Sequence, residues 1–528
     1  MTISLCKLLK FRIGLLAALM PFALPHSMKG DSRKFELSSA TVQDINAAFD
    51  AGALTSERLV ELYLARIKAY DQQGPGLNSI IYLNPAALEE ARALDAERQE
   101  SGPRSPLHGI PVVLKDLFDV EGMPTSGGFV GLADSLPWRD GWVGAKLRQA
   151  GAIVLAKTNM NDWFAQAGWA NSTVQGQIRN PYAPEYTPGG SSGGSGAAVA
   201  AWFATVGFGS ETGVSIRNPT SENNLVGLAP THGLISRDGM IMSAFTHERG
   251  GPMTRNVYDL AATLTAVAGF DPNDLTTMAS RGHVPEKGYL QFLDPQRGLH
   301  GARIGVLREM FRSGPAHDDA LALIEQAIED LKEAGATIHD PVLTGLPLLS
   351  ILSETRVSAY EKRLSTNLYL TTLGPDAKYQ SMTEMIEAHP DLLEHLRERD
   401  ELDAIDFNLA YLSRLKNREM LQNALVQVMN DYRLDALVFP FKTLPAARIE
   451  DGWNNREADN PLSSQTGFPA LLVPAGLTGD GLPIALEFLG RPFDEPVLIR
   501  LASAYEAVTG HRQDPPSTPP LDGEVFTY

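Results

Sequence analysis

The chain has 528 residues, 43% hydrophobic and 20% charged, which is enough apolar material for a large globular core. Its net charge of −18 disfavours nucleic acid and anionic membranes as partners, because phosphate groups repel an acidic surface. We therefore expect a small or neutral substrate, no nucleic acid and no obligate membrane partner, and homodimerisation stays open.

The first 28 residues have the pattern of a signal peptide. Lys7, Lys10 and Arg12 precede an apolar run at 13–25 that is too short to span a bilayer. No clean Ala-x-Ala cleavage site follows, so an N-terminal anchor and a buried helix remain alternatives. Cleavage would give a periplasmic or secreted protein, whereas the chain would otherwise be cytoplasmic.

Cysteine and histidine usage limits the chemistry that is available. The single cysteine, Cys6, lies in the N-terminal segment, so a processed chain would contain none. Disulfides, a cysteine nucleophile and Cys-based zinc sites are thus excluded for the folded body. The eleven histidines form no His-Glu-x-x-His or His-x-His pattern, so no anchor for a metal is visible.

Helix and strand patterns alternate in the first third of the chain, as in α/β proteins. Periodicity predicts helices at 42–49, 55–67, 85–100 and 142–150, and strands at 80–83 and 152–156. Another apolar, β-branched run at 107–116 ends in Lys115 and Asp116. A lysine at a strand end is ordinarily a solvated side chain. The functional alternative is a desolvated lysine whose lowered pKa lets it act as a neutral base.

The stretch at 186–196 reads YTPGGSSGGSG. Such residues bury little apolar surface and cost entropy to fix, so their order needs a reason. The stretch fits neither phosphate-binding pattern, GxxxxGK[ST] or GxGxxG, but it contains GxSxG with Ser192 at the centre. Well-patterned apolar segments on both sides disfavour a flexible linker. We interpret this stretch as part of a site.

A helix predicted at 197–205 leads to a second turn rich in glycine and hydroxyl groups, at 207–219. Serine needs an adjacent base to act as a nucleophile, and acyl chemistry needs N–H donors for the oxyanion. The two turns and Lys115 could together supply a nucleophile, a proton relay and a base. The backbone N–H groups at 211–215 could serve an oxyanion.

The rest of the chain predicts core elements around a more polar segment at 346–433. Helices are expected at 257–268, 318–333 and 497–507, and strands at 303–307, 434–440, 468–475 and 484–490. We interpret the polar segment as an inserted helical cover. Its Tyr360, Tyr369 and Tyr379 are candidates for pocket walls, although ordinary packing is the simpler role.

Nine short motifs occur in a fixed order along the chain. They are GIPVVLKD at 109–116, KTNM at 157–160, GGSSGGS at 189–195, GVSIR at 213–217, VGLAPT at 226–231, GPMTR at 251–255, TGFPA at 466–470, GLPI at 481–484 and GRP at 490–492. In this order they resemble the amidase signature family of Ser-cisSer-Lys hydrolases. The resemblance covers about 40–310 and 434–512 and is weak between them.

The resemblance implies an α/β fold in which helices cover both faces of a large mixed β-sheet. It implies a single amidase domain at 35–520, with a signature core at about 90–260 and a helical insert at about 345–433. No cofactor and no metal are expected. The implied reaction is cleavage of a C–N amide bond through an acyl-enzyme.

Carried over position by position, the resemblance implies that Ser215 is the nucleophile, Ser191 the relay serine on a cis peptide bond, and Lys115 the base. Ser191 is favoured over Ser192 because it precedes Ser215 by 24 residues, the family's spacing between its two serines. The oxyanion donors would be the backbone N–H groups of Thr212, Gly213, Val214 and Ser215.

Three departures from the family pattern concern the surroundings of the nucleophile. Glu211 replaces the usual aspartate, which should matter little if the acid only orders the loop. Val214 replaces a common glycine and could narrow the acyl side of the pocket. The segment at 218–224 is unusually polar, and together with 126–138 and the insert it bears on pocket shape.

The leading hypothesis is a serine hydrolase of amides, anilides, carbamates or peptide amides, with esterase activity in addition. One alternative is an amidotransferase subunit of the same family that works with a partner. A non-catalytic binding module on the same scaffold is the alternative from another class. The retention of Lys115, Ser191 and Ser215 together disfavours the binding module.

Overall fold

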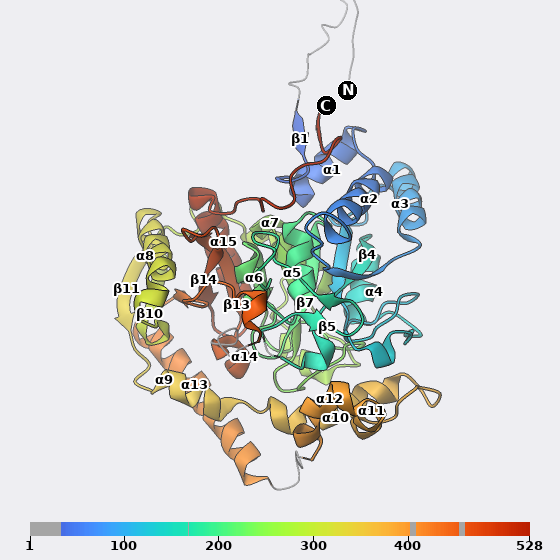
Figure 1. Ribbon diagram of the computed structural model, residues 1–528. Helices are drawn as coiled ribbons and strands as arrows, with labels where there is room; N and C mark the ends of the chain where they lie inside the picture. The colour runs from blue at the N-terminus through green and yellow to red at the C-terminus, as the bar shows by residue number, and fades with distance from the viewer. Residues whose placement is uncertain (1–32, 167, 402–407, 454–459) are drawn as a thin grey trace, which may run out of the picture.

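The computed structural model describes residues 33–166, 168–401, 408–453 and 460–528. Eleven strands form one mixed sheet in the order β11-β10-β12-β14-β13-β8-β9-β7-β3-β4-β2 (Figure 1). They are β2 (Ile80–Leu83), β3 (Pro111–Lys115), β4 (Ile153–Thr158), β7 (Val206–Glu211), β8 (Val226–Ala229), β9 (Arg249–Thr254), β10 (Arg303–Leu307), β11 (Thr337–Val342), β12 (Ala436–Pro440), β13 (Ala470–Leu477) and β14 (Pro483–Leu489). β3 runs parallel to β4 and β7, and β10 runs parallel to β11 and β12, whereas the other pairs are antiparallel.

Two groups of helices cover the sheet, as predicted. The first group packs in the order α4 (Trp142–Gln149), α7 (Val257–Val267), α15 (Glu495–Thr509) and α8 (Asp318–Glu333), and the second pairs α5 (Gly193–Ala200) with α6 (Arg217–Glu222). Helices from both groups, α8 and α6, contact β13 and β14, so the sheet lies between the groups (Figure 1). Its interior strands are therefore buried on both faces, which explains continuous apolar runs such as 152–156, whereas the edge strand β11 is mostly exposed or half-buried.

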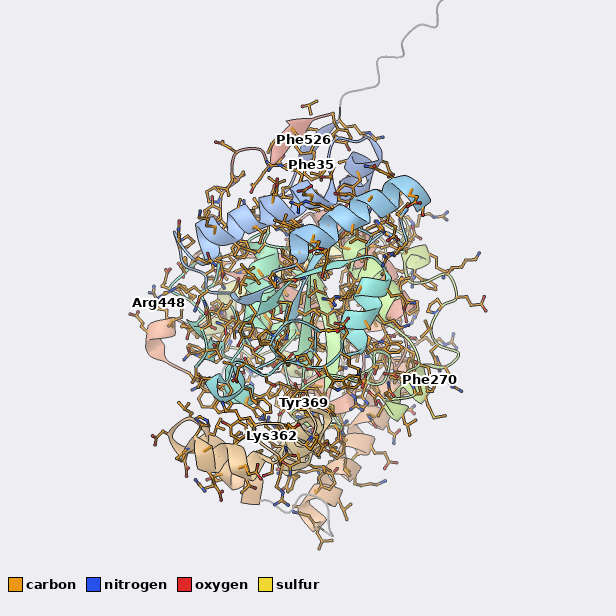
Figure 2. All side chains as sticks on the ribbon, turned by 90° about the vertical axis from the view of Figure 1, so that its right-hand side faces the viewer. Phe35, Phe270, Lys362, Tyr369, Arg448 and Phe526 are labelled. Carbon is orange, nitrogen blue, oxygen red and sulfur yellow. The ribbon has the colours of Figure 1, made fainter. Side chains whose placement is uncertain are left out.

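The two ends of the described chain meet at one end of the molecule. β1 (Lys34–Glu36) pairs with β15 (Val525–Thr527), and the rings of Phe35 and Phe526 stack with centroids 4.7 Å apart (Figure 2). Beside them lie α1 (Val42–Asp50), α2 (Ser56–Arg66), which continues as a π-helical turn, and α3 (Ala87–Ser101). The predicted signal peptide falls in residues 1–32, which are outside the described residues.

Among the described residues, five α-helices lie between Leu348 and Asp431, in the region where the helical insert is predicted. They are α9 (Leu348–Ile351), α10 (Ser358–Thr372), α11 (Met382–Ala388), α12 (Pro390–Glu401) and α13 (Leu409–Asp431). They cover the end of the core opposite to β1 and β15, as Lys362 and Tyr369 indicate in Figure 2. None of the described helices is long and apolar enough to cross a membrane. The boundaries predicted for the amidase domain, its signature core and the insert are not tested by the structure and remain predictions.

The glycine-rich segments differ from their predicted structure. α5 begins at Gly193, inside the glycine stretch, and ends at Ala200, while 206–211 forms the interior strand β7 and not a turn. The glycines serve close packing: a Cβ atom on Gly194 would lie 2.3 Å from the Asn159 carbonyl oxygen, and one on Gly209 would lie 2.8 Å from Ser192 Oγ. Composition alone indicated turns because it does not distinguish a flexible glycine from a tightly packed one.

Candidate active site

Lys115 is the last residue of β3, and its side chain is fully buried. Its Nζ lies 2.6 Å from Ser191 Oγ and 3.0 Å from Ser210 Oγ. Burial lowers the pKa of Lys115 to about 7, although the charges of Glu248 and Glu211 oppose the shift. Near neutral pH a large fraction of this amine is therefore uncharged and able to accept a proton.

Ser191 follows a cis peptide bond, Gly190–Ser191, and precedes the start of α5. A Cβ atom at residue 190 would lie 1.9 Å from the Trp169 carbonyl oxygen, so only glycine fits there. The neighbouring Ser192 points elsewhere: its hydroxyl bonds to the backbone N–H and carbonyl of Ser210. The structure thus brings Ser191, and not Ser192, to Lys115.

Ser215 shares a cavity of about 360 Å³ with Ser191. The other three predicted oxyanion residues, Thr212, Gly213 and Val214, line the same cavity. No hydrogen bond joins the Ser191 and Ser215 hydroxyls in the described contacts. Hydrogen bonds of this kind are often loose without substrate, so the shared cavity is the informative observation.

A buried ionic cluster fixes the turn that carries Ser215. Glu211 Oε2 accepts hydrogen bonds from the backbone N–H groups of Ile216 and Arg217, each at 3.1 Å. Arg217 Nη2 donates to the Gly213 carbonyl at 2.8 Å, and its Nε donates to Glu211 Oε1 at 2.8 Å. Glu211 therefore orders the loop. This is the role expected for the aspartate that is usual at this position, so the longer side chain of glutamate is tolerated.

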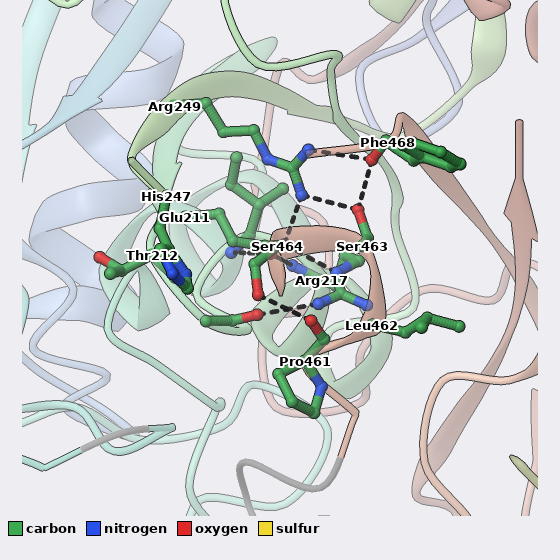
Figure 3. Close-up of polar contacts among 12 residues, drawn as sticks. Glu211, Thr212, Arg217, His247, Arg249, Pro461, Leu462, Ser463, Ser464 and Phe468 are labelled. Carbon is green, nitrogen blue, oxygen red and sulfur yellow. Dashed lines mark hydrogen bonds and ion pairs between the residues drawn. The ribbon is translucent and has the colours of Figure 1, made fainter. Parts of the chain in front are cut away.

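The cluster extends behind the turn into the core (Figure 3). Arg249 Nη2 lies 3.2 Å from Glu211 and donates to Ser463 Oγ at 2.6 Å, while Arg217 pairs with Glu487 at 3.0 Å. Burial alone would raise the pKa of Glu211, but the two arginines hold it below its usual value. Glu211 is thus a fixed anion that anchors two cations and the backbone of the turn.

The insert reaches the same turn through His247. The Nδ1 of His247 bonds to the Thr212 carbonyl at 3.2 Å, and its Nε2 accepts from Arg418 on α13 at 2.9 Å. Burial, followed by the charge of Arg418, places the pKa of His247 well below its usual value. The imidazole is therefore neutral and links the insert to the proposed oxyanion turn.

Amidase is the description of the family model that matches this chain, over residues 58–499. The chain belongs to the amidase signature family. The family member most useful for comparison is the peptide amidase of Stenotrophomonas maltophilia, which is 37% identical and superposes with a TM-score of 0.80 over 90% of this chain and 98% of that one.

Two further relatives match the chain over most of its length. A protein named a "probable amidase" of Arabidopsis thaliana is 30% identical over 508 residues, or 92% of this chain and 93% of that protein. A glutamyl-tRNA(Gln) amidotransferase subunit of Chloroflexus aggregans is 34% identical over 497 residues, or 90% and 97% of the two chains. The predicted family and fold are confirmed.

The lining of the cavity agrees with the prediction in part. Tyr369 is buried and donates to Asp119 at 3.0 Å, and neither it nor Tyr360 or Tyr379 lines the cavity. The segments 126–138 and 218–224 do not line it either. The insert does line the cavity, as predicted, with Leu349, Leu352, Ser353, Arg356 and Ser358. Of the expected wall residues outside the insert, Val214 is present, packed with Phe441, Leu472 and Ala485.

Sequence reasoning missed several residues of the site. Phe164 lines the cavity and places its ring centroid 5.5 Å from Lys115 Nζ, but a lone aromatic gives no pattern. His247 and Arg418 lie 171 residues apart in the chain, so no local signal could pair them. Among the described residues, no group of three His, Cys, Asp or Glu side chains could hold a metal.

Proposed function

We propose that this amidase hydrolyses a C–N amide bond through an acyl-enzyme on Ser215, with Ser191 as the relay and Lys115 as the base. The observation that carries the proposal is the short contact between Lys115 and Ser191 at the cavity that also contains Ser215. A buried lysine with a pKa near 7 can serve as this base without a histidine.

In the proposed reaction, Lys115 accepts the proton of Ser191 while Ser191 takes the proton of Ser215. Ser215 Oγ attacks the amide carbonyl, and the backbone N–H groups of the 212–215 turn stabilise the oxyanion. The proton then returns through Ser191 to the leaving amine. Water repeats the sequence in the acyl-enzyme and releases the acid.

The relatives support amide hydrolysis, but they also leave an amidotransferase subunit as an alternative function. The solved peptide amidase and the plant relative carry amidase names, and we extend amide cleavage to this chain on that basis. The amidotransferase subunits are about as similar, at 31–34% identity. If this chain were one of them, its activity would depend on a partner. The assembly state, including the homodimer, remains a prediction.

The isolated chain allows a direct test. It should release amine from acyl-p-nitroanilides, primary amides or carbamates, and Ser215→Ala should lower kcat by about a thousandfold or more with the fold retained. Circular dichroism would check the fold. Activity that appears only when an amidotransferase partner is added would favour the alternative, and a fully active Ser215→Ala enzyme would refute the nucleophile.

Export remains a proposal that rests on the N-terminal pattern of Lys7, Lys10, Arg12 and the apolar run at 13–25. Expression of the full chain followed by cell fractionation and N-terminal sequencing tests it. A new N-terminus near residue 29 outside the cytoplasm is expected, and an intact N-terminus in the cytoplasm would refute it.

A further inference from the structure

The charge of the cavity lining differs from the charge of the molecule. Although the chain carries a net charge of −18, Arg312 and Arg356 line the cavity, and no aspartate or glutamate of the described residues does. The remaining polar lining consists of hydroxyl and amide side chains and the neutral His247. The cavity is therefore locally favourable for an anion.

Arg356 enters the cavity from the insert, just before α10. Its side chain is exposed to solvent, and its Nε donates to Ser358 Oγ at 3.2 Å. Arg356 makes no ion pair with a carboxylate in the described ranges, and the charged neighbour that acts on it, Arg414, is another cation. The forked donors of its guanidinium remain available to a ligand.

Arg312 approaches from the sheet side, two residues after the 3-10 helix η6 (Arg308–Met310). It lines both the main cavity and a small adjoining pocket that contains Lys442. The two arginines thus come from separate parts of the fold, the core and the insert, and border the same space as Ser215. Arg356 could therefore hold an anionic group while the amide reaches the nucleophile.

We infer that the substrate is an amide that carries a carboxylate, bound by the guanidinium group of Arg356. This inference rests on the proposed function, since the amide must be presented to Ser215. The planar guanidinium group of Arg356 can donate two parallel hydrogen bonds to a carboxylate, which an uncharged substrate cannot accept in the same way, and apolar lining residues such as Phe164 and Leu352 could hold the carbon skeleton. The charge would select the substrate and would take no part in bond cleavage.

Two matched substrate pairs test the inference. Glutaryl-p-nitroanilide against pentanoyl-p-nitroanilide places the carboxylate on the acyl side, and N-acetyl-4-aminobenzoate against 4-methylacetanilide places it on the amine side. In at least one pair, kcat/KM should be about tenfold higher for the carboxylate, as expected for a charge-assisted hydrogen bond. Raising the ionic strength should reduce this preference.

Variants of Arg356 test whether this residue causes the preference for the carboxylate substrate. Arg356→Gln should bring the ratio within the pair close to one, mainly through KM, while Arg356→Lys should retain part of the preference. Arg397→Gln removes the same charge from the exposed surface of α12 and should leave the ratio unchanged. An unchanged ratio in Arg356→Gln would overturn the inference.

Binding to the Ser215→Ala variant separates the inference from the proposed function. Calorimetry with the unhydrolysed members of both pairs should show tighter binding of a carboxylate, and this difference should disappear when Arg356→Gln is added. Equal binding within both pairs overturns the inference even if the wild-type enzyme hydrolyses amides. Preferential binding without hydrolysis by the wild type supports the anion site and contradicts the proposed reaction.

Discussion

At the scale of single residues, the molecule places a lysine where water does not reach it. Lys115 is fully buried, and its contacts are the hydroxyls of Ser191 and Ser210 and the ring face of Phe164. Glu211 and Glu248 are near enough for their charges to favour the protonated form, but burial dominates. The side chain is therefore balanced between its two protonation states at neutral pH.

This balance predicts the acid limb of the pH profile. The pKa of Lys115 is lowered to about 7, so the active neutral form predominates above that pH and is lost below it. The kcat/KM for a neutral anilide should fall about tenfold per pH unit below the pKa of Lys115. Rates measured from pH 5 to 9 check this expectation, and a rate that stays constant from pH 8 down to pH 5.5 would contradict a neutral lysine base.

The residues themselves show how far the sequence could predict the site. Lys115 was a candidate because a charge ended an apolar strand, but only the fold shows that it is buried. The glycine stretch alone favoured Ser192 through GxSxG, and the family resemblance was needed to choose Ser191. Phe164 and Arg356 were missed because their place in the cavity depends on contacts between distant segments.

At the scale of elements, the turn between β7 and α6 is held from two sides. Glu211 and Arg217 fix its backbone from the sheet, and Arg418 of α13 reaches it through His247. The turn therefore depends on the core and on the insert together. Rigid N–H groups are what oxyanion stabilisation requires, because donors that must reorganise lose their advantage.

Glu211→Gln should weaken both stability and catalysis. The change removes a buried counter-charge from Arg217 and Arg249, and breaking such a pair typically costs about 3–5 kcal/mol. We expect a lower denaturation midpoint and a lower kcat with a smaller change in KM. Glu211→Asp, which keeps the charge and restores the usual residue, is the matched control, and equal behaviour of both variants would contradict the role of the charge.

The predicted elements were mostly present, and the errors share one cause. Periodicity located α1, α2, α8 and the strands β2 and β4, because their buried faces recur in the sequence. The glycine-rich sequence of β7 predicts a turn, because the glycines at 207 and 209 interrupt any apolar pattern. Its place between β9 and β3 depends on neighbours that are distant in the chain.

At the scale of the whole molecule, a buried ion pair ties the C-terminal segment to the N-terminal helices. Arg66 on α2 donates from Nη1 to both carboxylate oxygens of Glu524, at 2.9 and 2.8 Å, and its guanidinium lies 4.2 Å from the centroid of the Trp202 ring. Both charged side chains are almost completely buried. This pair and the β1–β15 pairing close the end of the molecule opposite to the insert.

Glu524→Gln should therefore destabilise the protein by about 3–5 kcal/mol, because Arg66 would remain buried without a counter-charge. Chemical denaturation measures the loss. The exposed pair Lys416–Glu419 provides the comparison, and Glu419→Gln should change the free energy of unfolding by less than about 1 kcal/mol. Similar losses in the two variants would contradict the proposed closure.

The acyl-enzyme is the central claim, and trapping it is the most direct test. The enzyme would be mixed with a p-nitrophenyl ester or carbamate, quenched within the turnover time, digested and analysed by mass spectrometry. Fragmentation of the modified peptide should place the acyl group on Ser215, and Lys115→Ala should reduce the rate at which the acyl-enzyme forms. An acyl group on Ser192 or Ser191, with Ser215 unmodified, would contradict the account.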